Sequence, residues 1–125
     1  MSKEELVNDL FQSVDSLDTA KFISFLTDDV TFRLGNAEAA SGKGTVEAMV
    51  GGFFGSISGM RHEIFEIWEH PNTVICQGNV TYIRKDSSEL SVPFANILKL
   101  DNDLIKEYLV YVDISELFKM AMSEK

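Results

Sequence analysis

Residues 61–113 read RHEIFEIWEHPNTVICQGNVTYIRKDSSELSVPFANILKLDNDLIKEYLVYVD and carry the clearest structural pattern in this chain of 125 residues. Apolar and polar side chains alternate along much of the segment, which is typical of β-strands. Short groups of turn-forming residues interrupt the alternation, first at Pro71 and Asn72 and later at 101–103. The pattern predicts four consecutive antiparallel strands, at Arg61–His70, Thr73–Lys85, Leu90–Leu100 and Leu104–Asp113.

Several of these predicted strands carry apolar residues on both faces. An antiparallel sheet in a small protein commonly buries one face and leaves the other in contact with water. We therefore expect one face to cover the helices that precede the sheet. The other face would expose a large apolar patch, so we expect a second copy of the chain to cover it. The residues expected at this homodimer interface are Val80, Tyr82, Ile97, Leu109 and Tyr111.

The residues before the sheet predict three helices and one further strand. Ser2 followed by Glu5 forms a capping-box pattern at the start of the first helix. Asp18 and Thr45 are expected to cap the second and third helices. Between them, Val30–Asn36 alternates as a strand. The resulting order is typical of an α+β fold in which the helices cover one face of the sheet.

Length and composition argue against several classes of partner and cofactor. The length predicts one domain, residues 1–125. A net charge of −9 argues against nucleic-acid and anionic-membrane partners, whose binding needs basic patches. Cys76 is the only cysteine, and its position relative to His62 and His70 does not match metal-ligand spacing, so we expect no metal and no cofactor. Neither a signal peptide nor a membrane-spanning apolar run is evident, which predicts a cytoplasmic location.

Counting residues outward from each predicted turn places polar side chains together. It puts Asn96 opposite both Asn79 and Tyr108, and His62 opposite Thr81. Opposed side chains on one face of a sheet lie about 5 Å apart. The sequence therefore predicts a polar row on the concave face of the sheet, with apolar residues around it.

His62 is the candidate catalytic residue, because imidazole is the one side chain of this row that transfers protons near neutral pH. The alternative is a buried histidine satisfied by Thr81 or by the backbone. Asn79 and Asn96 could orient a ligand oxygen, or they could hydrogen-bond to each other. Tyr108 could donate its phenol, or it could be a core residue. The expected ligand contacts are Phe32, Leu34, Phe53, Ile57, Gln77, Asn79, Phe94, Asn96, Tyr108 and Val110.

Three segments carry a resemblance to a known family: FISFLTDDVTFRLGN at Phe22–Asn36, SGKG at Ser41–Gly44 and IKEYLVYVD at Ile105–Asp113. With them, nearly the whole chain resembles the nuclear transport factor 2-like superfamily. Its SnoaL-like branch is the most similar and includes polyketide cyclases, ketosteroid isomerase and limonene epoxide hydrolase. The resemblance implies a cystatin-like α+β cone, in which a curved mixed or antiparallel sheet wraps around the N-terminal helices. It also implies a ligand pocket inside the cone and a dimer across the sheet.

The catalytic residues of these relatives do not carry over to this chain. The positions of the arginine and two aspartates of limonene epoxide hydrolase fall on Gln77, Asn79 and Val110. The catalytic positions of ketosteroid isomerase fall on Leu34, Leu10 and Asn96. Without carboxylates there, neither a general base nor a neutral carboxylic acid donor is available. We therefore expect neither of these two reactions.

Two functions remain open. The first is a cofactor-free enzyme of the isomerase, lyase or cyclase type, acting on a small, largely apolar organic molecule. In it His62 would transfer a proton while Asn79, Asn96 or Tyr108 held the substrate oxygen. The second is a non-catalytic ligand-binding or dimerisation module. The histidine favours the enzyme, and the lack of a carboxylate in the predicted row favours the module.

Overall fold

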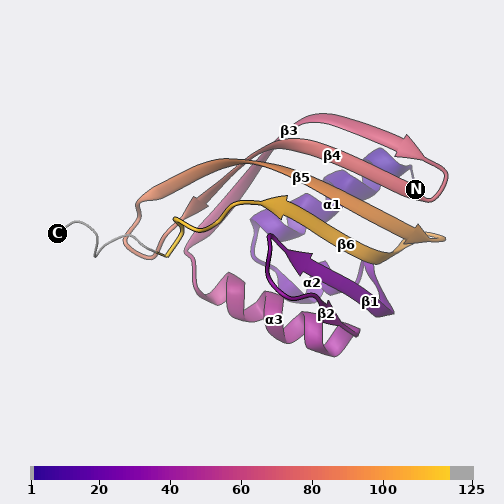
Figure 1. Ribbon diagram of the computed structural model, residues 1–125, viewed down its shortest axis with the longest axis horizontal. Coiled ribbons are helices and arrows are strands. Elements are labelled where there is room, and N and C mark those ends of the chain that lie inside the picture. The colour runs from indigo at the N-terminus through magenta and orange to yellow at the C-terminus, as the bar shows by residue number, and fades with distance from the viewer. Residues whose placement is uncertain (1, 119–125) are drawn as a thin grey trace.

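The structure is a computed structural model and describes residues 2–118. Over these residues the chain forms three helices and one curved, open sheet of six strands (Figure 1). The elements are α1 (Lys3–Asp15), α2 (Thr19–Ile23), β1 (Leu26–Leu34), β2 (Ala40–Ser41), α3 (Lys43–Gly55), β3 (Gly59–His70), β4 (Thr73–Ile83), β5 (Glu89–Asp101) and β6 (Leu104–Val112). The strand order is β2-β1-β6-β5-β4-β3, with β1 parallel to β6 and all other neighbours antiparallel. The predicted α+β cone with a mixed sheet is confirmed.

Local sequence explains where two of the helices begin. The Ser2 hydroxyl accepts a hydrogen bond from the Glu5 backbone, and the Glu5 carboxylate accepts one from the Ser2 backbone, each at 3.0 Å. The Asp18 carboxylate caps α2 by accepting a hydrogen bond from the Lys21 backbone at 3.1 Å. The predicted cap at Thr45 is wrong, because α3 already begins after Gly42, whose φ of 93° suits glycine. This conformation turns the chain from β2 directly into the helix.

The strand registers differ from the predicted ones at two places. The β3–β4 hairpin starts with His70 opposite Thr73, as expected, but a bulge between Ile64 and Glu66 shifts the pairing. His62 therefore lies opposite Val80 and not Thr81. The next hairpin closes earlier than expected, with Ile83 opposite Glu89 and a loop over 84–88. Both differences come from features of one or a few residues that hydrophobic periodicity does not reveal.

The predicted row of Asn79, Asn96 and Tyr108 is therefore wrong. Asn79 lies opposite Glu63 and Pro93 and is exposed on the outer face. The β4–β5 pairing is shifted by an odd number of residues, which moves a side chain to the other face of the sheet. The β5–β6 pairing is shifted by two residues at Asn96, so Asn96 and Tyr108 remain on the same inner face, both buried.

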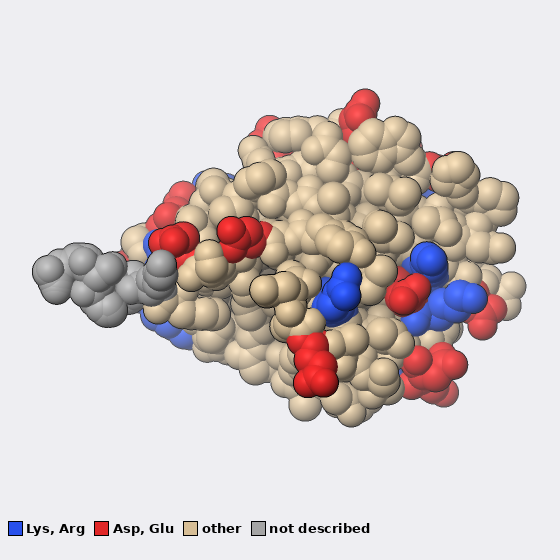
Figure 2. Space-filling view, viewed as in Figure 1, with Lys and Arg blue, Asp and Glu red and all other residues tan. Residues whose placement is uncertain are grey.

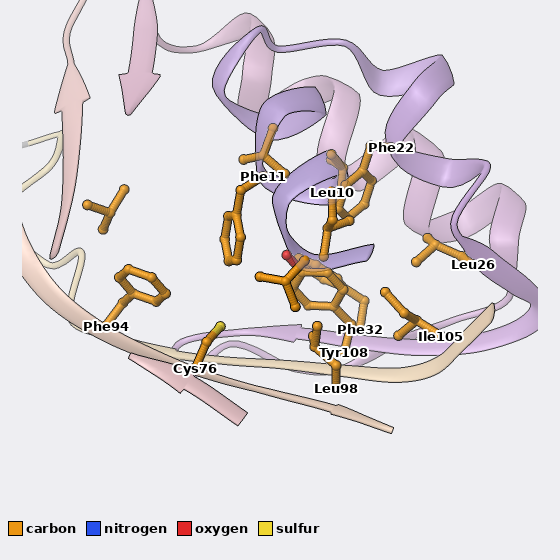
Figure 3. Close-up of a cluster of buried hydrophobic side chains, with 14 of the residues drawn as sticks. Leu10, Phe11, Phe22, Leu26, Phe32, Cys76, Phe94, Leu98, Ile105 and Tyr108 are labelled. Atoms are coloured by element: carbon orange, nitrogen blue, oxygen red, sulfur yellow. The ribbon is translucent and has the colours of Figure 1, made fainter. Parts of the chain in front are cut away.

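The inner face of the sheet and the helices enclose the hydrophobic core. Figure 3 shows Leu10 and Phe11 of α1 facing Cys76, Phe94 and Leu98 of the sheet. Val80 and Tyr82 belong to this core, with 1% and 2% of their surface exposed. Their predicted place at a dimer interface is therefore wrong, because the register shift of β4 turns both side chains inward.

The outer face of the sheet carries the apolar residues that the core does not use. A row of apolar side chains crosses four strands of this face, each opposite the next. The row consists of Trp68 on β3, Ile75 on β4, Ile97 on β5 and Leu109 on β6. Tyr111 lies on the same face and is 44% exposed. Figure 2 shows an uncharged tract over the middle of β4 and β5, with charged side chains around it. None of the helices in residues 2–118 has the length and apolar character needed to cross a membrane.

Candidate functional site

A largely apolar cavity lies between the three helices and the inner face of the sheet. The centre of a water-sized sphere can occupy about 70 Å³ of it. This is more room than one water molecule needs, so a small molecule can enter. The lining residues are Val14, Phe22, Phe32, Leu34, Met49, Val50, Phe53, Phe54, Met60, His62, Tyr82, Asn96, Tyr108 and Val110.

The structure brings most of the expected site residues together in this lining. They are His62, Phe32, Leu34, Phe53, Asn96, Tyr108 and Val110. Ile57 and Phe94 are buried in the neighbouring core but do not line the cavity. Gln77 and Asn79 do not belong to the site, because both lie on the outer face after the register shift of β4. Tyr82 joins the lining for the same reason.

His62 is held by a carboxylate that the sequence analysis missed. Its Nδ1 lies 2.6 Å from Oδ1 of Asp15, and its backbone N–H donates to Oδ2 of Asp15 at 3.1 Å. The His62 ring also contacts Phe11 and Phe94, at centroid distances of 4.5 and 5.1 Å. The predicted partner Thr81 instead hydrogen-bonds to Ser91. The carboxylate thought to be lacking from the site is thus supplied by a helix.

This pairing sets the chemistry of the imidazole. A neutral histidine carries one N–H, and the hydrogen bond made by one ring nitrogen determines which nitrogen carries it. With Nδ1–H donated to Asp15, the Nε2 of a neutral His62 is left as a proton acceptor. The carboxylate also stabilises the positive charge that forms when Nε2 takes up a proton. The pair can therefore act as a general base and return the proton as a general acid.

Two features of the sequence indicate that Asp15 has a partner outside its helix. Asp15 ends α1, and α1 has no basic residue in its last turn. A negative charge at the C-terminal end of a helix is disfavoured by the helix dipole. Asp15 also follows Phe11 by four residues, which places it on the apolar side of the helix. An acidic residue at an unfavourable helix end, on the buried side, indicates a partner elsewhere in the chain.

Asn96 is a buried amide in the lining. Only 2% of its surface is exposed, and within residues 2–118 its Oδ1 has no hydrogen-bond partner. A buried acceptor without a partner costs about 1–3 kcal/mol. The predicted alternative, in which Asn96 bonds to Asn79, is wrong because the two side chains lie on opposite faces of the sheet.

The remaining titratable side chains near the cavity stay protonated at neutral pH. Burial raises the pKa of the Tyr82 phenol. Burial, followed by the charges of Cys76, Tyr82 and Asp15, raises the pKa of the Tyr108 phenol. Both phenols are therefore neutral O–H donors. Burial raises the pKa of the Cys76 thiol to about 12, so it is a poor nucleophile. No cluster of three or more potential metal ligands occurs in the described part of the chain.

Solved structures similar to this one share the fold across most of their length. An NTF2-like protein of unknown function from Burkholderia pseudomallei is 16% identical, with a TM-score of 0.83 over 96% of this chain and 98% of that chain. A protein with a ketosteroid isomerase-like fold from Catenulispora acidiphila, in complex with trimethylamine, is 14% identical, with a TM-score of 0.82 over 97% and 95%. An LEH-like epoxide hydrolase from M. tuberculosis is 16% identical, with a TM-score of 0.77 over 92% and 85%. At these identities the likeness concerns the fold alone.

The family is shown by sequence. No curated protein matches the chain. The family model of the SnoaL-like domain matches residues 7–108, which include Asp15, His62, Asn96 and Tyr108. This match covers most of the chain, and the curved sheet around three helices agrees with it. The chain belongs to the SnoaL-like domain family.

Proposed function

We propose that this protein is a cofactor-free enzyme that moves a proton on a small, largely apolar organic molecule bound in the cavity. The observation that carries the proposal is the 2.6 Å contact between His62 Nδ1 and Asp15 Oδ1 in the wall of an apolar cavity. A histidine–carboxylate pair is a means of general acid–base catalysis. His62 lines this cavity, so a molecule bound there would lie beside the pair.

The lining supports proton transfer next to a carbonyl group. His62 Nε2 would take a proton from the carbon beside the carbonyl, and the electron pair of the broken C–H bond would form a C=C bond. The carbonyl π electrons would move to oxygen, where a phenol O–H of Tyr82 or Tyr108 would stabilise the developing charge. Return of the proton from His62 to a different atom would complete an isomerisation.

The family supports this proposal at a coarser level. Similar folds include an LEH-like epoxide hydrolase, and one relative is in complex with a small organic amine. These relatives favour a small organic ligand within the same fold. The residues proposed for the chemistry here are this chain's own, since the positions that match the catalytic carboxylates of limonene epoxide hydrolase and ketosteroid isomerase hold other residues.

Exchange of the α-protons of cyclohexanone in D₂O tests the proposal. Cyclohexanone is a single-ring ketone, and its exchange can be followed by proton NMR at pH 8 after subtraction of the buffer rate. The wild-type protein should accelerate the exchange. His62→Ala should reduce the protein-catalysed rate about 100-fold or more. The matched control is His70→Ala, because His70 is exposed in β3 and lies at its far end; it should leave the rate unchanged.

A second candidate function is binding without chemistry. The observation that favours it is the buried Oδ1 of Asn96, which has no partner within residues 2–118 and could hold a ligand without reacting with it. Exchange that is no faster with wild-type protein than with His62→Ala would overturn the enzyme proposal and favour this binding module.

We also propose that the protein is a homodimer through the outer face of the sheet. The support is the continuous apolar row of Trp68, Ile75, Ile97 and Leu109, with Tyr111 beside it. Trp68 and Tyr111 are each 44% exposed in the single chain. Contiguous exposed apolar surface of this kind is typical of an interaction site. A second copy would cover the row by presenting the same row in a two-fold arrangement.

A further inference from the structure

The hydrogen-bonding groups of the cavity define the kind of ligand it can satisfy. Four lining side chains carry such groups: His62, Tyr82, Asn96 and Tyr108. Within residues 2–118, none of the lining residues is a lysine or an arginine. All other lining side chains are hydrocarbon or thioether. Specificity in such a cavity depends on these few polar groups.

Two of the groups are acceptors, and one of them is buried without a donor among the described residues. The Oδ1 of Asn96 has no partner within residues 2–118, and Asn96 is 98% buried. The Nε2 of neutral His62 is the second acceptor, because Nδ1–H is already donated to Asp15. Polar groups buried in proteins are nearly always hydrogen-bonded. The cavity therefore calls for a ligand that brings a hydrogen-bond donor.

The two tyrosines add donors to the same space. No hydrogen bond of the Tyr82 or Tyr108 phenol to a side chain or backbone group is found in the described residues. A hydroxyl group both donates and accepts, so a single ligand O–H could donate to Asn96 and accept from a tyrosine. An ether or a hydrocarbon of the same shape would leave Asn96 unsatisfied.

Charge and volume narrow the ligand further. Among the described residues a bound anion would meet no lysine or arginine in the lining, and the Asp15 carboxylate is hydrogen-bonded to His62. Burial of an unpaired charge is costly, so carboxylates and phosphates are disfavoured. The cavity is larger than one water molecule needs, but it offers only about 70 Å³ for the centre of a water-sized group, which favours a ligand of one ring over a larger one.

We infer that the cavity takes a neutral, single-ring hydroxyl compound, a phenol or an enol, whose O–H donates to Oδ1 of Asn96. This inference rests on the proposed function in that both place the ligand in the same cavity. It adds the chemical class of the ligand and the residue that selects it. Asn96 would select the ligand, whereas His62 would transfer the proton and Asp15 would orient the His62 ring.

The test compares phenol, toluene and benzoate as ligands. Binding is measured from the methyl NMR signals of Met49 and Met60, which line the cavity. Toluene has the shape of phenol without its donor, and benzoate carries a negative charge. Asn96→Leu removes the acceptor at nearly constant volume. Because toluene is the more hydrophobic ligand, the quantity compared is the ratio of phenol affinity to toluene affinity in each protein.

The ratio should fall about tenfold or more from wild type to Asn96→Leu, and benzoate should not bind. An unchanged ratio, or benzoate binding as tight as phenol binding, would overturn the inference. Should Asn96→Leu fail to fold, the side-chain amide signal of Asn96 in the wild type gives the same answer: it should shift with phenol and not with toluene. A shift with neither, or an equal shift with both, would also overturn it.

The two proposals fail separately. A phenol preference that depends on Asn96, without cyclohexanone exchange, would leave this inference standing and overturn the enzymatic function. Cyclohexanone exchange that depends on His62, without a phenol preference, would leave the enzymatic function standing and overturn this inference.

Discussion

Replacing Asp15 by Asn separates two effects that act on stability in opposite directions. Asp15 accepts two hydrogen bonds from His62, one from the backbone and one from the ring. Hydrogen bonds to a charged group contribute about 1.5–3 kcal/mol each, and less where water reaches them. The side chains of Asp15 and His62 are 31% and 9% exposed, so we expect these two hydrogen bonds to contribute only part of that free energy. Loss of the charge should therefore destabilise the fold.

The helix dipole acts the other way. Asp15 is the last residue of α1, where a negative charge costs about 0.3–1 kcal/mol. Asp15→Asn would recover this cost, and asparagine would still accept one hydrogen bond. Because the contacts with His62 outweigh the dipole, the net expectation is a loss of about 1–2 kcal/mol.

Urea unfolding at a fixed protein concentration measures this difference. With an m-value of about 1–3 kcal/mol per molar urea, the midpoint should fall by roughly 1 M. The matched control is Asp9→Asn, which removes a carboxylate from the same helix six residues earlier. Its effect should stay within about 0.5 kcal/mol. An Asp15→Asn variant that is as stable as the wild type, or more stable, would refute the claim that Asp15 is held by His62.

Two further predictions concern pH and assembly. Burial raises the pKa of Cys76 to about 12, so the folded state keeps a proton that the unfolded thiol releases above about 9. The free energy of unfolding, measured with urea, should therefore fall between pH 8.5 and 10 by up to about 1.4 kcal/mol per pH unit. It should fall less steeply in Cys76→Ala, and an equal fall in both proteins would contradict this. Sedimentation should give a dimer of the 14.0 kDa chain. Ile97→Glu should split the dimer into monomers, whereas the control Lys99→Gln on the same strand should keep it. A monomeric wild-type protein would rule out the interface.

The order of helices and strands could be predicted because its signals are local. The capping box of Ser2 and Glu5 and the alternation in residues 61–113 each act over a few residues. The register could not be predicted, because it depends on a single-residue bulge after Ile64 and on the length of the loop over 84–88. These features moved Asn79 out of the site and brought Tyr82 into it.

The site was predicted only where its residues were insensitive to these shifts. Asn96 and Tyr108 remained on one face because the β5–β6 pairing moved by two residues. Asp15 was missed because its partner lies 47 residues away, beyond the reach of any periodicity. Contacts of this length come from tertiary packing of α1 on β3, which no local pattern encodes.

The position of the proton on the His62 ring tests whether Asp15 holds this imidazole with Nε2 free to accept a proton. Long-range ¹⁵N–¹H NMR correlation at pH 8 distinguishes the two neutral forms of each histidine, and the chain has only His62 and exposed His70. We expect His62 to carry its proton on Nδ1, donated to Asp15, with Nε2 unprotonated, and His70 to average between both forms. A proton on Nε2 of His62, or the same averaging as at His70, would contradict it.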